Sequence, residues 1–193
     1  MKADWTLILA MAGIGLLAVS ALTEVPSFIW NRTASMPEGL YVIHPQPGYK
    51  RGMIVAYRPS QVESDLLEER SYTGRGWPLI KRVAAVSGDT VCRHADRIEI
   101  SGTYAATAAA SDAAGRPLPV WQGCRSLGHE DVFLLGDDER SVDGRYFGTQ
   151  DARRILGEAR LLTLERFGTK AAGNPASSAS DAPPPDCRSS DGG

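Results

Sequence analysis

The feature that most constrains this chain is an apolar run near its start. Residues 5–25 read WTLILAMAGIGLLAVSALTEV, and the first charge in this run is Glu24. At about 1.5 Å of rise per residue, a helix over this run is roughly 30 Å long, which matches the hydrocarbon core of a bilayer. We therefore predict a single N-terminal transmembrane helix, a membrane anchor within residues 1–27. A cleaved secretory signal is the alternative, since Lys2 is a positive start and AVSA resembles a cleavage site. Both interpretations export the rest of the chain.

The remainder divides by composition into a domain and a tail. Residues 168–193 are small, polar and rich in proline, so they cannot bury enough apolar surface to offset the entropy of ordering. We expect a disordered tail there and one globular domain over residues 28–167. The formal net charge of −2 offers no basic field for a phosphate backbone, and we expect no nucleic acid partner.

Short β-forming runs separated by turn residues predict a mainly β domain. The runs are GLYVIHP, GMIVAYRP, LIKRVAAVSGDTV, RIEISG, EDVFLLGD and ARLLTLERF. One short helix is expected within residues 61–78, because Val62, Leu66 and Leu67 recur at helical spacing. Residues 103–119 lack a period, and we place them in a surface loop or a β excursion.

Two of the three cysteines can form a disulfide within this domain. Cys187 lies in the expected tail, which leaves Cys92 and Cys124. An oxidising compartment permits this bridge, and closing a loop of about thirty residues contributes about 3 kcal/mol. Two buried free thiols are the alternative. The histidines and cysteines lack the spacing of metal ligands and no nucleotide-binding loop is present, so we expect no metal and no cofactor.

A serine stands in the stretch TASMPEG, residues 33–39, about ten residues beyond the apolar run. Pro37 fixes its own φ and keeps Met36 out of the α region, so residues 35–37 are expected to be extended before Gly39 allows a turn. This places Ser35 on an extended edge just outside the membrane. Most serines in such stretches are turn residues without chemistry, and a nucleophilic serine needs a base within hydrogen-bond reach.

Lysine is a better candidate for that base than histidine. The histidines stand in turn-like or surface contexts without an orienting acid, which disfavours a Ser-His-Asp triad: His44, His94 and His129. Lys81, in PLIKRVAAVSGDTV, is the lysine flanked by an apolar strand. Burial there would lower its pKa, and a fall to near 8 would cost about 3 kcal/mol. A lysine whose stem covers the core while its ammonium stays in water is the alternative.

The motifs, taken in order, resemble those of a known enzyme family. SMPEG is followed by LYVI, GMIVAY, IKRVAAVSGDTV and GDDERSVDGRYFG, which resemble the ordered boxes of type I signal peptidases over roughly residues 30–167. The short chain, the SMP-x-GLY opening and the cysteine pair around a GRPLP loop look most like the conjugative-transfer (TraF-type) peptidases of plasmids. The resemblance implies a signal-peptidase-like β-domain that follows the membrane helix.

The resemblance also implies roles for three residues around the scissile bond. Ser35 resembles the nucleophile and Lys81 the general base, a dyad that performs acyl transfer without histidine. The Ser35 backbone N–H would meet the oxyanion, and Thr33 resembles the position whose hydroxyl is a second donor. An ordinary turn hydroxyl is the alternative for Thr33.

The box GDDERSVDGRYFG implies the residues that support the lysine. Ser141 resembles the residue that hydrogen-bonds the lysine ammonium, while Asp143 and Arg145 resemble an acid and a guanidinium that pair beside it. Gly144 and Asp138 depart from the common pattern, which has serine and asparagine there. The alternative is a plain β-turn with a surface ion pair.

The function implied is that of a membrane-bound serine endopeptidase that processes exported precursor proteins. Its catalytic domain would lie in the periplasm, held to the bacterial inner membrane, and its partners would be the lipid bilayer and a membrane-tethered precursor such as a pilin. A general signal peptidase is one alternative. An inactive exported β-domain with an assembly or binding role is an alternative of another class.

Overall fold

The computed structural model describes Trp5, residues 9–11 and residues 28–162. Most of the predicted anchor and all of the predicted tail therefore lie outside the described residues. Within the described part of the chain, no helix is long and apolar enough to cross a bilayer. The membrane anchor and the tail stay predictions.

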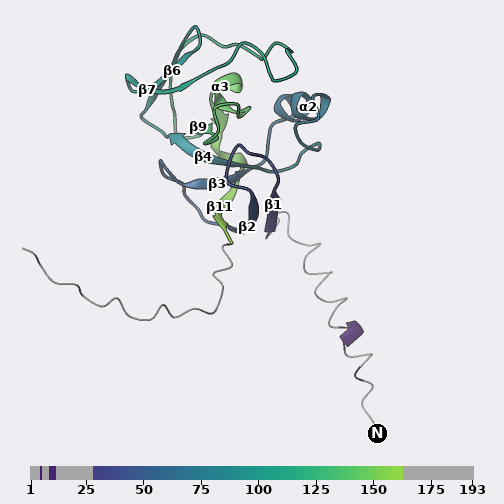
Figure 1. Ribbon diagram of the computed structural model, residues 1–193. Helices are drawn as coiled ribbons and strands as arrows, with labels where there is room; N and C mark the ends of the chain where they lie inside the picture. Colours follow the sequence, from purple (N-terminus) through teal and green to yellow (C-terminus); the bar gives the residue numbers. More distant parts are fainter. Residues whose placement is uncertain (1–4, 6–8, 12–27, 163–193) are drawn as a thin grey trace, which may run out of the picture. The chain divides into compact units, whose positions relative to one another are not determined.

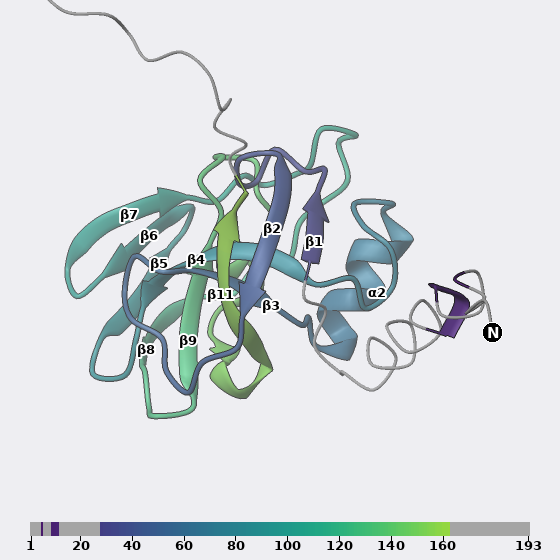
Figure 2. The same ribbon diagram turned by 90° about the horizontal axis from the view of Figure 1, so that it is seen from below.

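A seven-stranded antiparallel sheet carries the site (Figures 1 and 2), and the mainly β prediction is confirmed. Its spatial order is β1-β2-β11-β3-β4-β9-β10. The strands are β1 Phe28–Asn31, β2 Gly39–His44, β3 Ile54–Tyr57, β4 Leu79–Ala85, β9 Asp131–Leu135, β10 Gln150–Asp151 and β11 Ile155–Leu161. Strand β1 is an edge strand, whereas β4 lies between β3 and β9.

A second sheet of four strands has the order β7-β6-β5-β8. These strands are β5 Thr90–His94, β6 Arg97–Ile100, β7 Thr103–Thr107 and β8 Gly123–Ser126. Cys92 and Cys124 face each other across β5 and β8, and they form a disulfide with an S–S distance of 2.03 Å. Residues 103–119 are a β excursion: β7 is followed by a hairpin over residues 109–118, closed by a bridge between Ser111 and Pro117.

Helix α2, Gln61–Glu69, lies within the residues where a short helix was expected. Of the apolar residues that recur at helical spacing, Leu67 is buried, whereas Val62 is 77% exposed. The reason is a capping box, in which Ser60 N–H donates to the Glu63 carboxylate and the Ser60 hydroxyl accepts from Glu63 N–H. The Glu63 carboxylate also accepts from Tyr57 Oη at 2.9 Å, which turns this acid inward. The remaining helices are α3 Gly144–Phe147 and the 3₁₀ turn η1 Ala152–Arg154.

The hydrophobic core covers both faces of β4. Ile80 packs with Met36 and Tyr41 on one side, and Val83 packs with a cluster that includes Leu134 on the other. Successive residues of a strand point to opposite faces, so in a strand covered on both sides two neighbouring side chains can both be buried. Lys81 follows Ile80 directly and is only 4% exposed.

Candidate active site

The turn between β1 and β2 is held together by the side chain of Asn31. Its Nδ2 donates to the carbonyl oxygens of Thr33 at 3.0 Å, Met36 at 3.0 Å and Pro37 at 3.1 Å. Its Oδ1 accepts from the backbone N–H of Thr33 at 3.2 Å and from Thr33 Oγ1 at 2.9 Å. Ser35 therefore lies within a turn, and the expectation of an extended segment at residues 35–37 is wrong at its first residue. The turn forms earlier than Gly39 because Asn31 satisfies its backbone groups.

The hydroxyls of Thr33 and Ser35 are neighbours at the surface of this turn. Their oxygens are 3.0 Å apart, and either can be the donor. Next in the chain, Met36 is 1% exposed within the core, and the Tyr41 hydroxyl donates to the Pro37 carbonyl at 2.8 Å. A buried side chain on one side and Asn31 on the other thus fix the position of Ser35.

Residues 136–143 form a loop that closes on this turn. The backbone N–H of Asp137 donates to the Ser35 carbonyl oxygen at 2.7 Å. A Cβ at Gly136 would lie 2.7 Å from that same oxygen and would collide with the Ser141 hydroxyl. Position 136 therefore has to be glycine, which allows the loop to approach both serines. Asn31 and Gly136 were missed by the sequence reasoning, and the only signals were an asparagine and a glycine of the kind found in many turns.

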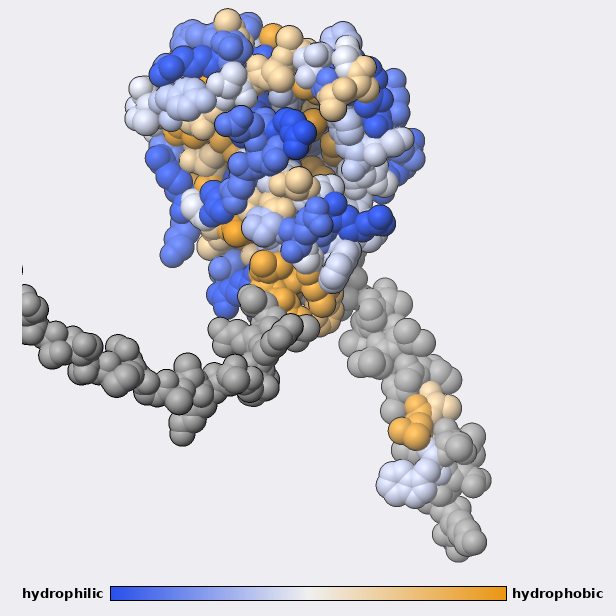
Figure 3. Space-filling view, viewed as in Figure 1, coloured by the Kyte–Doolittle hydropathy of each residue, from blue (hydrophilic) through white to orange (hydrophobic). Residues whose placement is uncertain are grey.

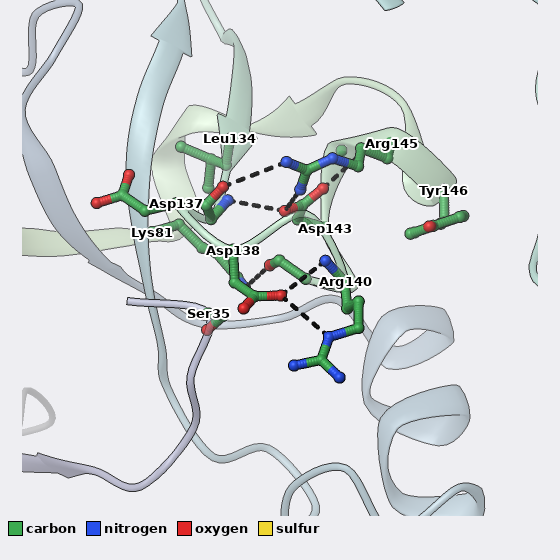
Figure 4. A network of polar contacts seen from close by, with 12 residues as sticks. Ser35, Lys81, Leu134, Asp137, Asp138, Arg140, Asp143, Arg145 and Tyr146 are labelled. Carbon is green, nitrogen blue, oxygen red and sulfur yellow. Dashed lines mark hydrogen bonds and ion pairs between the residues drawn. The ribbon is translucent and has the colours of Figure 1, made fainter. Parts of the chain in front are cut away.

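The amine of Lys81, a residue of β4, reaches this loop (Figure 4). Nζ donates to Ser141 Oγ at 2.7 Å, across 60 residues of sequence. Burial lowers the pKa of Lys81 to about 8, with the nearby Asp143 carboxylate opposing the shift and the Arg145 guanidinium adding to it. The side chain does not place its ammonium in water, so the alternative of a solvated lysine does not describe the structure.

Asp143 and Arg145 form a buried ion pair behind Ser141. Arg145 Nη1 lies 2.5 Å from Asp143 Oδ2, and the two side chains are 6% and 0% exposed. The Asp143 carboxylate also accepts from the backbone N–H of Gly136 at 2.7 Å and of Arg145 at 3.0 Å, which caps α3. The pair ties the two ends of the loop together, so a surface ion pair does not describe it.

The two departures from the common pattern have local explanations. A Cβ at Gly144 would lie 2.7 Å from the Leu134 carbonyl oxygen and 2.7 Å from the Phe133 ring, so a serine does not fit there without rearrangement. The Asp138 carboxylate accepts from the backbone N–H of Arg140 at 2.7 Å and lies 3.7 Å from Arg140 Nε. Asp138 thus orders its own turn of the loop.

Ser35 and Lys81 line one cavity of about 490 Å³, which we call the lysine-side cavity. Thr33 and Ser141 also line it, so the structure brings four of the predicted site residues to one place. Figure 3 shows this face of the molecule hollowed between α2 and α3, with hydrophobic surface inside. A polar floor with a serine hydroxyl and a buried amine inside a largely apolar cavity is suited to acyl transfer.

The other reactive side chains lie away from this cavity. His44, His94 and His129 are exposed. Among the described residues, the one group with the closeness of metal ligands is Cys92, His94 and Cys124, whose donor atoms lie within 4.8 Å of one another. The two sulfurs are bonded to each other as a disulfide, so they are not available as thiolate ligands.

Comparisons with known proteins agree with the order of the motifs. A family model described as "Signal peptidase, peptidase S26" matches residues 2–164. The chain belongs to this signal peptidase family. Among curated proteins, the plasmid transfer protein TraF of Escherichia coli is 34% identical over 156 residues, covering 75% of this chain and 87% of TraF. Within this family, the chain is of the TraF type.

A solved signal peptidase I from Enterococcus faecalis V583 is 20% identical, with a TM-score of 0.36, over 62% of this chain and all of the other. In this chain, Ser35, Lys81 and Ser141 lie around one cavity, and Lys81 Nζ donates to Ser141 Oγ.

Proposed function

We propose that this chain is a membrane-bound serine endopeptidase in which Ser35 is the nucleophile and Lys81 the general base. The observation that carries the proposal is the buried amine of Lys81, which donates to Ser141 Oγ at 2.7 Å and lines the same cavity as Ser35. A base for serine has to be neutral near physiological pH, and burial brings the pKa of Lys81 down to about 8.

The reaction follows the usual course of acyl transfer. Neutral Lys81 accepts the proton of the Ser35 hydroxyl while Oγ attacks the scissile carbonyl carbon, and the resulting ammonium then protonates the leaving nitrogen as the C–N bond breaks. A water molecule, deprotonated by the same amine, then attacks the ester carbonyl carbon, and the ammonium protonates Ser35 Oγ as the C–O bond breaks and the carboxylic acid is released. Each proton that Lys81 accepts is thus returned.

The oxyanion of the tetrahedral intermediate needs hydrogen-bond donors. The Ser35 backbone N–H is one, and the Thr33 hydroxyl, 3.0 Å from Ser35 Oγ, is close enough to be the other. Removing one such donor typically costs about 2.7–4 kcal/mol of transition-state stabilisation. Asn31 accepts from the Thr33 hydroxyl at 2.9 Å, so a rotation of that hydroxyl toward substrate exchanges this bond for another.

Ser141, Asp143 and Arg145 hold the lysine in position. A four-carbon stem has many rotamers in water, and the hydrogen bond to Ser141 together with burial selects one. The buried pair of Asp143 and Arg145 fixes the loop that carries Ser141.

The client is a precursor protein tethered to the membrane, and the likeness to TraF supports a precursor of the conjugation apparatus, such as a pilin. Ser35 follows the apolar run 5–25 by ten residues, so an anchor in the inner membrane would hold the periplasmic domain at the depth of a tethered substrate. An extended substrate can add to the free edge of β1, because β1 is the last strand of its sheet.

The test is cleavage of a co-expressed pilin precursor in membranes by the parent chain and by Ser35→Ala and Lys81→Ala. Both variants are expected to lose processing at unchanged protein level, whereas Lys50→Ala, at an exposed lysine, keeps it. Processing that survives Lys81→Ala would remove lysine as the base. A precursor that the parent leaves intact while it cleaves secreted preproteins would point to a general signal peptidase.

A further inference from the structure

Two cavities meet at Ser35, and only one of them is lined by Lys81. The second cavity, about 740 Å³, is lined by residues 29–33 of β1 and its turn and by residues 77–80 before and in β4; we call it the β1-side cavity. The residues that line both cavities are Thr33, Ser35, Tyr72, Thr73 and Leu79. Lys81 lines the lysine-side cavity and is not among the residues of the β1-side cavity.

This difference sets the direction of a bound substrate. If Lys81 protonates the leaving nitrogen, as the proposed function requires, that nitrogen must be on the side of Ser35 where the amine lies. The chain after the scissile bond then enters the lysine-side cavity. The chain before the bond runs through the β1-side cavity, along the free edge of β1.

We propose that the lysine-side cavity is a specificity subsite that selects an apolar side chain at the first residue after the scissile bond. Apart from the dyad, its walls are mainly apolar side chains from separate elements: Leu67 of α2, Leu79 of β4, Leu118 of the hairpin, and Val142 and Tyr146 around α3. A volume of about 490 Å³ lies within the roughly 300–1,000 Å³ of cavities that bind ligands. This inference rests on the proposed function.

The outer wall of this cavity is built to be rigid. The hairpin over residues 109–118 is clamped to the chain that follows α2, because the Asp112 carboxylate accepts from the Tyr72 hydroxyl and, at 2.8 Å, from Arg116 Nε. Arg70 Nη2 donates to the Pro117 carbonyl at 2.8 Å, and Arg70 Nη1 lies 3.7 Å from Asp112. The Asp112 side chain is 6% exposed.

A wall held in this way does not have to be ordered when substrate binds, so it can discriminate between side chains by shape. On the side of α3, the Tyr146 hydroxyl accepts from the backbone N–H of Ala109 at 3.0 Å, which fixes the other end of the hairpin. Two charged residues line the cavity at its rim, and they are of opposite sign, with Arg140 Nε 3.7 Å from Asp138 Oδ1. The apolar interior therefore dominates the selection.

The experiment uses the full-length protein and pilin precursors with leucine, alanine or aspartate at the first residue after the cleavage site. Ala109→Trp and Ala113→Trp place a large ring into the cavity, and Ala114→Trp is the matched control, since Ala114 is exposed on the same hairpin but does not line the cavity. The readout is kcat/KM for each precursor. A parallel series with substitutions three residues before the cleavage site reports on the β1-side cavity.

The parent is expected to cleave the leucine precursor about tenfold or more faster than the aspartate precursor. Ala109→Trp and Ala113→Trp should remove that preference by lowering the leucine rate while the alanine rate changes little, and Ala114→Trp should keep it. Equal rates for the three precursors, or tryptophan variants that slow all three alike, would overturn the inference. If none of the precursors is cleaved in a way that depends on Ser35, the proposed function is contradicted, and the subsite with it.

Discussion

Replacing Lys81 by methionine is expected to stabilise the domain at pH 7 while abolishing its activity. Burial lowers the pKa of Lys81 from 10.5 to about 8. Each pKa unit corresponds to about 1.36 kcal/mol, so a charged ammonium at this position costs the folded state about 3 kcal/mol. The side chain is 4% exposed, and water offers little compensation. Methionine keeps the unbranched stem and removes the charge.

Part of this gain is lost at Ser141. Its hydroxyl accepts from Lys81 Nζ at 2.7 Å, and Ser141 is itself 4% exposed. Leaving that hydroxyl without its partner costs about 1 kcal/mol. The net stabilisation at pH 7 is therefore about 2 kcal/mol.

The sign of the effect changes with pH. The lysine titrates near 10.5 in the unfolded chain and near 8 in the folded one, so between these values the unfolded state binds more protons. The free energy of unfolding of the parent therefore rises with pH across this window, whereas Lys81→Met lacks this dependence on pH. The advantage of Lys81→Met should shrink above pH 8 and vanish near pH 10, and only above pH 10.5 should it become a disadvantage approaching about 1 kcal/mol.

The assay is urea denaturation of the full-length protein in detergent at pH 7 and at pH 9.5, with the disulfide intact. Lys50→Met, at an exposed lysine, is the control and should leave the free energy of unfolding nearly unchanged. A variant less stable than the parent at pH 7 would refute the reasoning. So would a stability difference that does not depend on pH, because the charge of Lys81 would then not be its source.

The remaining predictions concern the loop, the ion pair and the disulfide. Because the base must be neutral, kcat/KM of the parent should rise with pH to a plateau above about 8. Ser141→Ala should lower kcat by about ten- to a hundredfold, because the Lys81 amine loses the hydrogen bond that orients it. A pH–rate profile of each protein measures both effects. Asp143→Ala leaves the Arg145 guanidinium buried without its partner, which should lower the free energy of unfolding by about 3–5 kcal/mol in urea. The double variant Cys92→Ser/Cys124→Ser should lose about 3 kcal/mol of stability with little change in kcat, and an unchanged urea midpoint would contradict this.

Much of the sheet could be predicted because strands have local signatures. The runs that became β2, β3, β4 and β9 are apolar, rich in β-branched residues and bounded by turn residues, which is information contained within each segment. Strand β1 was missed because it is four residues long and directly follows the apolar run, and β8 because all its residues are exposed. In α2 the acid Glu63 is buried while the apolar Val62 is exposed, because the Glu63 carboxylate accepts from Tyr57 Oη of β3, a contact that helical spacing does not reveal.

What the sequence determined by itself is the chemistry available to the chain. It has one lysine within an apolar strand and a serine between a threonine and a proline, and in a strand of that composition burial follows from the hydrophobic effect. Those features are local and made Ser35 and Lys81 candidates, and the resemblance of the ordered motifs to signal peptidases then implied their roles before any contact was known.

Only the tertiary structure decided how those groups meet. Lys81 and Ser141 are 60 residues apart, and Tyr72 and Asp112 are 40 residues apart, yet each pair is hydrogen-bonded across the lysine-side cavity or its wall. Such contacts depend on the order of strands in the sheet, and on β4 lying between β3 and β9, which no single segment encodes. The necessity of glycine at position 136 arises in the same way, because the space that excludes a side chain there is defined by Ser35 and Ser141 from elsewhere in the fold.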